Sequence, residues 1–294
     1  MNQVNALSID VEDYFHVSNF SKVIKFSDWD KYQCRVERNT LHVLNVLNEF
    51  NVKATFFVLG WIAERYPELI ENIHQEGHEI ASHGYCHQLI ASQTREEFRE
   101  DVRKTKRILE DITGVDVMGY RAPTYSITQK SFWTFEILIE EGFKYDSSIF
   151  PIRHYGYGIP DTPRFPHIIN INGLNQTNDL TISNGSNDKF IIEFPISTLR
   201  LAGTNLPIAG GGYFRLFPYQ FTKWGLKKIN QKEKKPFIFY IHPWELDPDQ
   251  PRFKEAPRLS RFRHYVNLDK TEPKLKRLLE DFNFSTVRNV LGLT

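Results

Sequence analysis

The sequence predicts an α/β protein with a parallel sheet, most simply a single barrel with loop insertions. Short apolar runs typical of strands alternate with helix-length connections from the N-terminus to about residue 148. Polar clusters follow the ends of several of these runs, and the carboxyl ends of parallel strands are where barrel enzymes place their active sites. The 294 residues suffice for a large domain with a sizeable core.

Each element up to residue 148 has its own signal. Strands are indicated by alternating or continuous apolar runs, and helices by caps and by apolar residues three and four apart. Asn39 or Thr40 is expected to cap the first helix, Gly77 ends the second, and Thr94 with Glu97 forms a capping box before the third. The predicted strands are 4–11, 53–59, 78–82, 117–121 and 143–148, and the predicted helices are 41–50, 61–76, 94–113 and 128–141.

The chain after residue 150 is less regular. Residues 151–189 are rich in Pro, Gly and Asn, with Asn-Gly turn signals at 172–173 and 184–185, and predict hairpins and loops that elaborate one face. We expect residues 1–294 to form one barrel domain, with 243–294 as a C-terminal extension that packs on it. Further strands are predicted at 190–194, 236–241 and 284–287, and helices at 218–230 and 272–282.

Composition argues against several classes of function. Hydrophobic residues make up 40% and charged residues 25% of the chain, as in ordinary globular proteins. A formal net charge of +1 favours neither nucleic acid nor an acidic membrane as a bulk partner. Two cysteines without a Cys-x-x-Cys spacing indicate no disulfide framework.

The N-terminus lacks a basic region followed by an apolar run, and no stretch is apolar enough to span a bilayer. We therefore expect a soluble, cytoplasmic protein without a transmembrane segment. Peripheral membrane contact is compatible with these features, and the sequence carries no signal for the oligomeric state.

A histidine pair is the strongest local signal. His83 and His87 follow the strand predicted at 78–82, and a spacing of four is one helical turn, so both side chains can face the same way. Two imidazoles on one face form part of a zinc site, which a carboxylate from elsewhere in the chain would complete. An isolated pair would be interpreted as incidental surface histidines, but here other polar clusters supply the missing parts.

Five polar clusters occupy equivalent positions in the predicted fold. Each follows a predicted strand, and in a parallel barrel these strand ends meet at one mouth. The clusters are Asp10 with Glu12 and Asp13, His83 with His87, Arg121, Asp146, and His242.

Five motifs stand at these positions, in the order Ser-Ile-Asp-Val-Glu-Asp at 8–13, Ser-His-Gly-Tyr-Cys-His at 82–87, Arg-Ala-Pro-Thr-Tyr at 121–125, Tyr-Asp-Ser-Ser at 145–148 and Tyr-Ile-His at 240–242. Together they resemble the motifs of the polysaccharide deacetylase family with the NodB-homology domain, carbohydrate esterase family 4. The resemblance implies a distorted (β/α) barrel, usually of seven units.

Three more segments indicate which subgroup of this family the sequence resembles. They are Gly-Gly-Gly-Tyr-Phe-Arg-Leu at 210–216, Ile-His-Pro-Trp-Glu at 241–245 and Arg-Phe-Arg-His-Tyr at 261–265. These segments resemble the bacterial subgroup encoded with exopolysaccharide loci. The implied activity is metal-dependent removal of N-acetyl groups from N-acetylhexosamine in a surface polysaccharide or its precursor, so the expected partner is a glycan or sugar-precursor substrate.

The resemblance also implies roles for the polar residues. Asp10 would take a proton from the attacking water, and Arg121 would hold Asp10 ionised. His242 would protonate the leaving sugar amine, and Asp146 is expected to orient His242. The metal is expected to be Zn²⁺, or another divalent transition metal such as Co²⁺ or Ni²⁺, and it would lower the pKa of a bound water to roughly 7.

His83 and His87 are the implied metal ligands, together with one carboxylate. The family commonly has adjacent aspartates, whereas Val11 here separates Asp10 from Glu12. Strand alternation puts Asp10 and Glu12 on one side of the strand, but a turn beginning at Val11 would present Asp13 instead. Both Glu12 and Asp13 are therefore candidates.

Substrate contacts are expected from the third and fifth motifs. Tyr125 and Trp244 are candidates for stacking on sugar rings, and Pro123 belongs to the same segment as Tyr125. The backbone N–H of Tyr125 is a candidate donor to the oxyanion of the reaction. Glu245 is interpreted as a structural ion-pair partner.

Two other functions are compatible with the pattern. One is hydrolysis of a small amide by an allantoinase-like relative, which the retention of both histidines argues against. The other is glycan binding without catalysis, which would make Asp10 and His242 dispensable. The basic run Arg252, Arg258, Arg261 and Arg263 is interpreted as a solvated loop rather than as a phosphate site.

Overall fold

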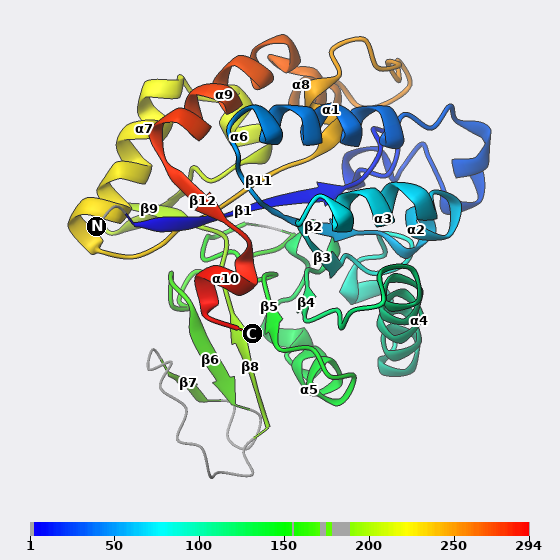
Figure 1. Ribbon diagram of the computed structural model, residues 1–294, viewed down its shortest axis with the longest axis horizontal. Helices are drawn as coiled ribbons and strands as arrows, with labels where there is room; N and C mark the ends of the chain where they lie inside the picture. The colour runs from blue at the N-terminus through cyan, green and yellow to red at the C-terminus, as the bar shows by residue number, and fades with distance from the viewer. Residues whose placement is uncertain (1–2, 155, 171–174, 178–188, 294) are drawn as a thin grey trace.

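The computed structural model describes residues 3–154, 156–170, 175–177 and 189–293. Strand β1 (Val4–Val11) runs through the middle of the molecule (Figure 1). It pairs in parallel with β2 (Thr55–Val58) on one side and with β11 (Ile238–Ile241) on the other, and its first residues also pair in parallel with β12 (Asn283–Ser285). Its residues are buried from Asn5 onward, as expected for a strand covered on both faces.

The sheet is mainly parallel, as the alternation of strands and helices predicts. In the described part of the chain, parallel neighbours follow one another in the order β11, β1, β2, β3 (Glu79–Ser82), β4 (Gly119–Tyr120), β5 (Tyr145–Asp146) and β8 (Phe190–Glu193). These seven strands match the number of units that the family resemblance implies. Between β8 and β11 the chain forms a separate antiparallel hairpin, β9 (Thr198–Leu201) and β10 (Thr204–Pro207).

Part of the predicted elaboration at 151–189 is described. Strand β6 (His167–Asn170) pairs antiparallel with β8, and β7 (Asn175–Thr177) pairs antiparallel with β6. The Asn-Gly signals at 172–173 and 184–185 lie outside the described residues.

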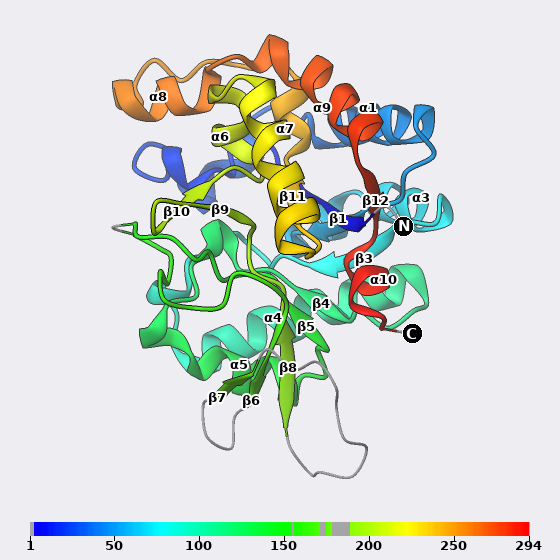
Figure 2. The same cartoon turned by 90° about the vertical axis from the view of Figure 1, so that its left-hand side faces the viewer.

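Helices flank the sheet (Figures 1 and 2). Among the described residues, no helix has the length and apolar character that crossing a membrane requires. The helices are α1 (Val36–Glu49), α2 (Gly60–Arg65), α3 (Pro67–Gln75), α4 (Arg95–Thr113), α5 (Trp133–Glu140), α6 (Gly211–Leu216), α7 (Tyr219–Lys228), α8 (Arg258–Tyr265), α9 (Thr271–Asp281) and α10 (Val287–Leu291).

Local signals placed some helix ends correctly and others not. Thr94 and Glu97 form the predicted capping box of α4, and Gly114 ends that helix with a positive φ of 70°. The single helix predicted at 61–76 is in fact two, because Pro67 starts α3 and cannot continue α2. The predicted cap at Asn39 or Thr40 is wrong, since α1 begins at Val36.

Candidate active site

A carboxylate and two imidazoles meet beyond the ends of β1 and β3. Oε1 of Glu12 lies 3.0 Å from Nε2 of His83 and 3.1 Å from Nε2 of His87. In a tetrahedral zinc site with bonds of about 2.0 Å, neighbouring ligand atoms stand about 3.3 Å apart. Both the spacing and the types of these three donors therefore fit one divalent transition metal ion.

The histidine pair does not lie on a helix, contrary to the geometry assumed from its spacing. Residues 83–87 form a bend in which Gly84 has φ +72° and His87 has φ +52°. Both carboxylate oxygens of Asp101 on α4 accept hydrogen bonds from the backbone N–H of Tyr85, at 3.1 and 3.0 Å, and hold the bend in place. The left-handed backbone at His87 is uncommon for a residue with a side chain and is typical of functional sites.

The tautomer of His83 is fixed by a backbone contact. Nδ1 of His83 lies 2.8 Å from the carbonyl oxygen of Arg121, and because a carbonyl only accepts, Nδ1 carries the proton. Nε2, on the side of Glu12, is therefore the ring atom that could bind a metal. Such a second contact to a backbone carbonyl is usual for histidine ligands of metals.

The structure separates the two candidate carboxylates. Asp13 accepts hydrogen bonds from the backbone N–H of Tyr14 and of Val36, both at 2.8 Å, and from that of Arg35. It therefore caps the N-terminus of α1 from a distant part of the chain, which explains why this helix starts before the predicted cap. Burial raises the pKa of Asp13, and the structure brings Glu12, not Asp13, to the histidines.

Asp10 and Arg121 form a buried ion pair beside this cluster. Nη1 of Arg121 lies 2.5 Å from Oδ1 of Asp10 and 2.8 Å from Oγ of Ser8. The remaining nitrogens of Arg121 donate to the backbone and side chain of Ser147. Both charges are thus compensated without water, and Oδ2 of Asp10 stays available on the side of His242 and Tyr125.

His242 follows β11 and faces both carboxylates. Its Nε2 lies 3.9 Å from Oδ2 of Asp10 and 3.9 Å from Oε1 of Glu12. Its Nδ1 lies 2.6 Å from Oε1 of Glu245, whose other oxygen binds Nε of Arg215 at 2.6 Å. Burial alone would lower the pKa of His242, but Glu12, Glu245 and Asp10 together raise it to about 9.

Glu245, rather than Asp146, therefore lies against His242. Asp146 instead accepts hydrogen bonds from the backbone N–H and the hydroxyl of Ser148, at 3.0 and 2.6 Å. The hydroxyl oxygen of Ser148 in turn accepts from the backbone N–H of Ala122 at 2.7 Å, so Asp146 acts on the segment that carries Arg121. The prediction that Glu245 is only a structural ion-pair partner is therefore incomplete. Its position three residues after His242 was the feature of the sequence that could have indicated this contact.

The expected sugar contacts fit the structure only in part. Tyr125 places its hydroxyl 3.4 Å from Oδ2 of Asp10, but its backbone N–H already donates to Ala122 and is not a free oxyanion donor. Trp244 is 4% exposed, and the rings of His242 and His264 stack on it at centroid distances of 5.2 and 4.2 Å. Its ring therefore has no room for a sugar. Pro123 is buried.

Comparisons with known proteins agree with this geometry. Residues 23–138 match the family model described as Polysaccharide deacetylase, and residues 147–292 match a domain of unknown function, DUF3473. Over 98 residues the chain is 37% identical to a peptidoglycan-N-acetylglucosamine deacetylase of Bacillus cereus, an alignment that covers 33% of this chain and 36% of that protein. The chain spans about a third of the length of the curated relatives it matches first.

Two solved structures show the same fold at low identity. A Mycobacterium smegmatis protein assigned as a polysaccharide deacetylase superposes with a TM-score of 0.58 and 18% identity, over 100% of this chain and 96% of that one. Puue allantoinase superposes with a TM-score of 0.56 and 15% identity, over 98% and 88%.

Fold and site together define a deacetylase-type barrel with a candidate metal centre at its mouth. Residues 23–138 are similar to the polysaccharide deacetylase family, whose model they match.

Proposed function

We propose that the protein is a metal-dependent hydrolase that removes N-acetyl groups from N-acetylhexosamine units of a bacterial surface polysaccharide or its precursor. The observation that carries the proposal is the meeting of Glu12, His83 and His87 with Asp10 and His242. A single site thus contains three metal donors, a carboxylate base and an imidazolium acid.

The metal site would consist of Glu12, His83 and His87, with Zn²⁺ as the first candidate and Co²⁺ or Ni²⁺ as others. Two histidines and one carboxylate are the ligand set of several catalytic zinc sites, which leave a position for water. When bound, such an ion supplies a water of lowered pKa and polarises the acetyl carbonyl.

Asp10 is the proposed general base. Arg121 holds Oδ1 of Asp10 at 2.5 Å, so Oδ2 is the atom that takes a proton from the attacking water. Tyr125 contacts the same oxygen at 3.4 Å and restricts its direction.

His242 is the proposed general acid. An amine cannot leave as an anion, so its nitrogen has to be protonated as the C–N bond breaks. In the absence of an ion, the carboxylates of Glu12, Glu245 and Asp10 raise the pKa of His242 to about 9, which favours the protonated ring at neutral pH. Glu245 fixes the ring through Nδ1 and thereby directs Nε2 toward the two carboxylates.

The test is acetate release from defined substrates. Protein stripped with a chelator and reloaded with Zn²⁺ or Co²⁺ is incubated with N-acetylglucosamine oligomers and with peptidoglycan, and acetate is measured. We expect release only from reloaded protein, and none from His83→Ala or from Asp10→Asn. His74→Ala, on α3 outside the site, is the matched control and should keep wild-type turnover.

Each variant reports on a separate step. His83→Ala should lose bound metal by elemental analysis, whereas Asp10→Asn should keep it and still release no acetate. Turnover that is equal in the stripped, reloaded and His83→Ala proteins would remove the metal from the mechanism. Release from a small ureide but from no N-acetylated sugar would favour the allantoinase-like alternative.

A further inference from the structure

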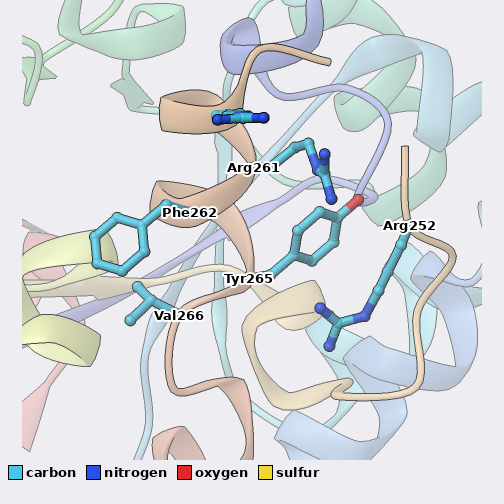
Figure 3. Close-up of a pocket in the computed structure, with 6 residues that line it drawn as sticks. Arg252, Arg261, Phe262, Tyr265 and Val266 are labelled. Atoms are coloured by element: carbon cyan, nitrogen blue, oxygen red, sulfur yellow. The ribbon is translucent and has the colours of Figure 1, made fainter. Parts of the chain in front are cut away.

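A second site lies outside the proposed active site, on helix α8 and the loop before it. A cavity of about 440 Å³ opens there. Figure 3 shows the ring of Tyr265 between the side chains of Arg252 and Arg261. The lining residues are Arg252, Arg258, Arg261, Phe262, Tyr265 and Val266.

Among the described residues, the arginines of this cavity have no acidic partner. In the described part of the chain, no ion pair involves Arg252, Arg258 or Arg261. Arg252 lies over the ring of Tyr265 at 4.9 Å, and Arg261 donates only to the backbone carbonyl of Lys254 at 3.5 Å. Three guanidinium groups around one cavity leave most of their donors for a ligand, and their planar forks suit phosphate oxygens.

The hydroxyl of Tyr265 does not compete for such a ligand. It donates to the carbonyl of Pro251 at 3.1 Å and accepts from the backbone N–H of Phe253 at 2.9 Å. Tyr265 is therefore a fixed wall of the cavity, and the charge available to a ligand is the positive charge of the arginines.

Apolar side chains stand beside the arginines in contact with solvent. Leu259 is 60% and Phe262 is 55% exposed, and they are three residues apart on α8, so they share one side of the helix. A soluble phosphate would be bound by the arginines alone and would leave both side chains in water. Cationic and large apolar residues on one short helix are instead the combination that favours the interface of an anionic bilayer.

Helix α8 is joined to the proposed active site by stacked rings. His264, on its buried side, stacks on Trp244, and Trp244 stacks on the proposed acid His242. Phe20, in the segment that follows β1, contacts His264 at a centroid distance of 4.6 Å. The cavity therefore lies on the same side of the barrel as the strand ends that form the site.

We propose that this cavity binds the phosphate group of an anionic lipid, and that Leu259 and Phe262 enter the apolar layer of the same bilayer. The protein would thereby be held on a membrane surface with the mouth of its barrel close to that surface. This inference does not rest on the proposed deacetylase activity.

The experiment is binding of the full chain to lipid vesicles, measured by co-sedimentation. We expect binding to vesicles of phosphatidylcholine with phosphatidylglycerol, and none to phosphatidylcholine alone. Because each basic residue near such a surface is worth about 1 kcal/mol, a factor of about five, the loss of two in Arg258→Gln/Arg261→Gln should lower the partition coefficient about thirtyfold. Leu259→Ser/Phe262→Ser should also lower it.

Matched controls come from other helices. Arg107→Gln removes an exposed arginine on α4, and Trp224→Ser removes a large exposed ring on α7, where the wild-type residue is 48% exposed. Both should bind vesicles as the wild type does. Asp10→Asn should also bind normally, so a failure of the proposed catalysis is distinguished from a failure of membrane binding. Far-UV circular dichroism checks that each variant is folded.

Three outcomes would overturn the proposal. In the first, the wild type does not bind vesicles. In the second, Arg258→Gln/Arg261→Gln binds them as strongly as the wild type does. In the third, the wild type binds phosphatidylcholine vesicles as strongly as vesicles that contain phosphatidylglycerol. A parallel titration with pyrophosphate separates the sources of the anion. If Arg258→Gln/Arg261→Gln abolishes pyrophosphate binding while no folded form binds vesicles, the cavity takes a soluble anion and the lipid assignment is wrong.

Discussion

Glu12 and Asp13 are adjacent in the chain, yet their carboxylates contact different groups in different parts of the structure. Glu12 faces two imidazoles, whereas Asp13 accepts backbone hydrogen bonds at the start of α1. The alternation of a strand predicts that Asp10 and Glu12 share a side. It could not show that Asp13 would find its partners more than twenty residues later, since that contact depends on the path of the intervening loop.

We expect this division to appear in two variants. Glu12→Gln should lose bound Zn²⁺, because an amide is a poor ligand for zinc and the two histidines alone do not complete the site. Asp13→Asn should keep Zn²⁺ but lower the free energy of unfolding by about 1–2 kcal/mol through the loss of helix capping. Elemental analysis and urea titration measure the two effects. Zinc lost from Asp13→Asn but kept by Glu12→Gln would reverse the assignment.

Glu245 acts on the proposed chemistry through His242, so it is a positioning residue. Burial lowers the pKa of His242, but the negative charge of Glu12 and then that of Glu245 outweigh this effect and contribute to a pKa of about 9. Glu245→Gln should lower that pKa, so the protonated acid is lost at a lower pH. We therefore expect the alkaline limb of the kcat profile to move to lower pH.

The control for this pH profile is Asp249→Asn, an exposed acid just beyond the same segment, which should leave the limb in place. If kcat of Glu245→Gln were reduced at every pH while the alkaline limb stayed in place, Glu245 would support the folded structure without affecting the pKa of His242.

At the scale of single elements, local chemistry was predictable and long-range contacts were not. The capping box of Thr94 and Glu97 and the strand that carries Asp10 follow from neighbouring residues, and the structure confirms both. The start of α1 and the bend at 83–87 were missed, because Asp13 and Asp101 reach them from other elements. The spacing of the histidines therefore indicated correctly that the two side chains lie together, but the helical backbone inferred from it was wrong.

The ends of β5 and β8 provide a stability test. Asp146 and Glu193 are both fully buried and adjacent, and burial, followed by the charge of Asp146, raises the pKa of Glu193 well above its usual 4.5. A raised pKa stabilises the folded state below pH 4.5, and this contribution is lost as the pH rises toward the folded-state value. Glu193→Gln lacks this dependence and keeps a hydrogen-bond donor.

We therefore expect Glu193→Gln to gain stability relative to the wild type as the pH rises from 5 to 8, measured as the difference in urea midpoints. Glu68→Gln, at an exposed position on α3, should show no such trend. A difference between Glu193→Gln and the wild type that is constant with pH would mean that Glu193 is ionised in the folded protein at both ends of this range.

At the scale of the whole molecule, the two matched family models meet between residues 138 and 147, yet the structure does not divide there. Strand β1 lies between β2 from the first part and β11 from the second, and β5 pairs with β8. The candidate site is shared in the same way, since Glu12, His83 and His87 precede the boundary and His242 and Glu245 follow it. We therefore propose that residues 1–294 fold as one unit.

This proposal predicts the behaviour of the separated parts. Residues 1–146 alone would leave one edge of β1 unpaired and would expose apolar side chains that pack against Phe237 and Phe239, so neither 1–146 nor 147–294 should unfold cooperatively in urea. The intact chain should show a single transition by circular dichroism and by tryptophan fluorescence. Co-expression of the two parts should restore that transition and, with metal, acetate release, because the sheet and the site then have all their residues. Cooperative unfolding of residues 1–146 by themselves would instead establish two independent domains, and the shared site would then be an interface between them.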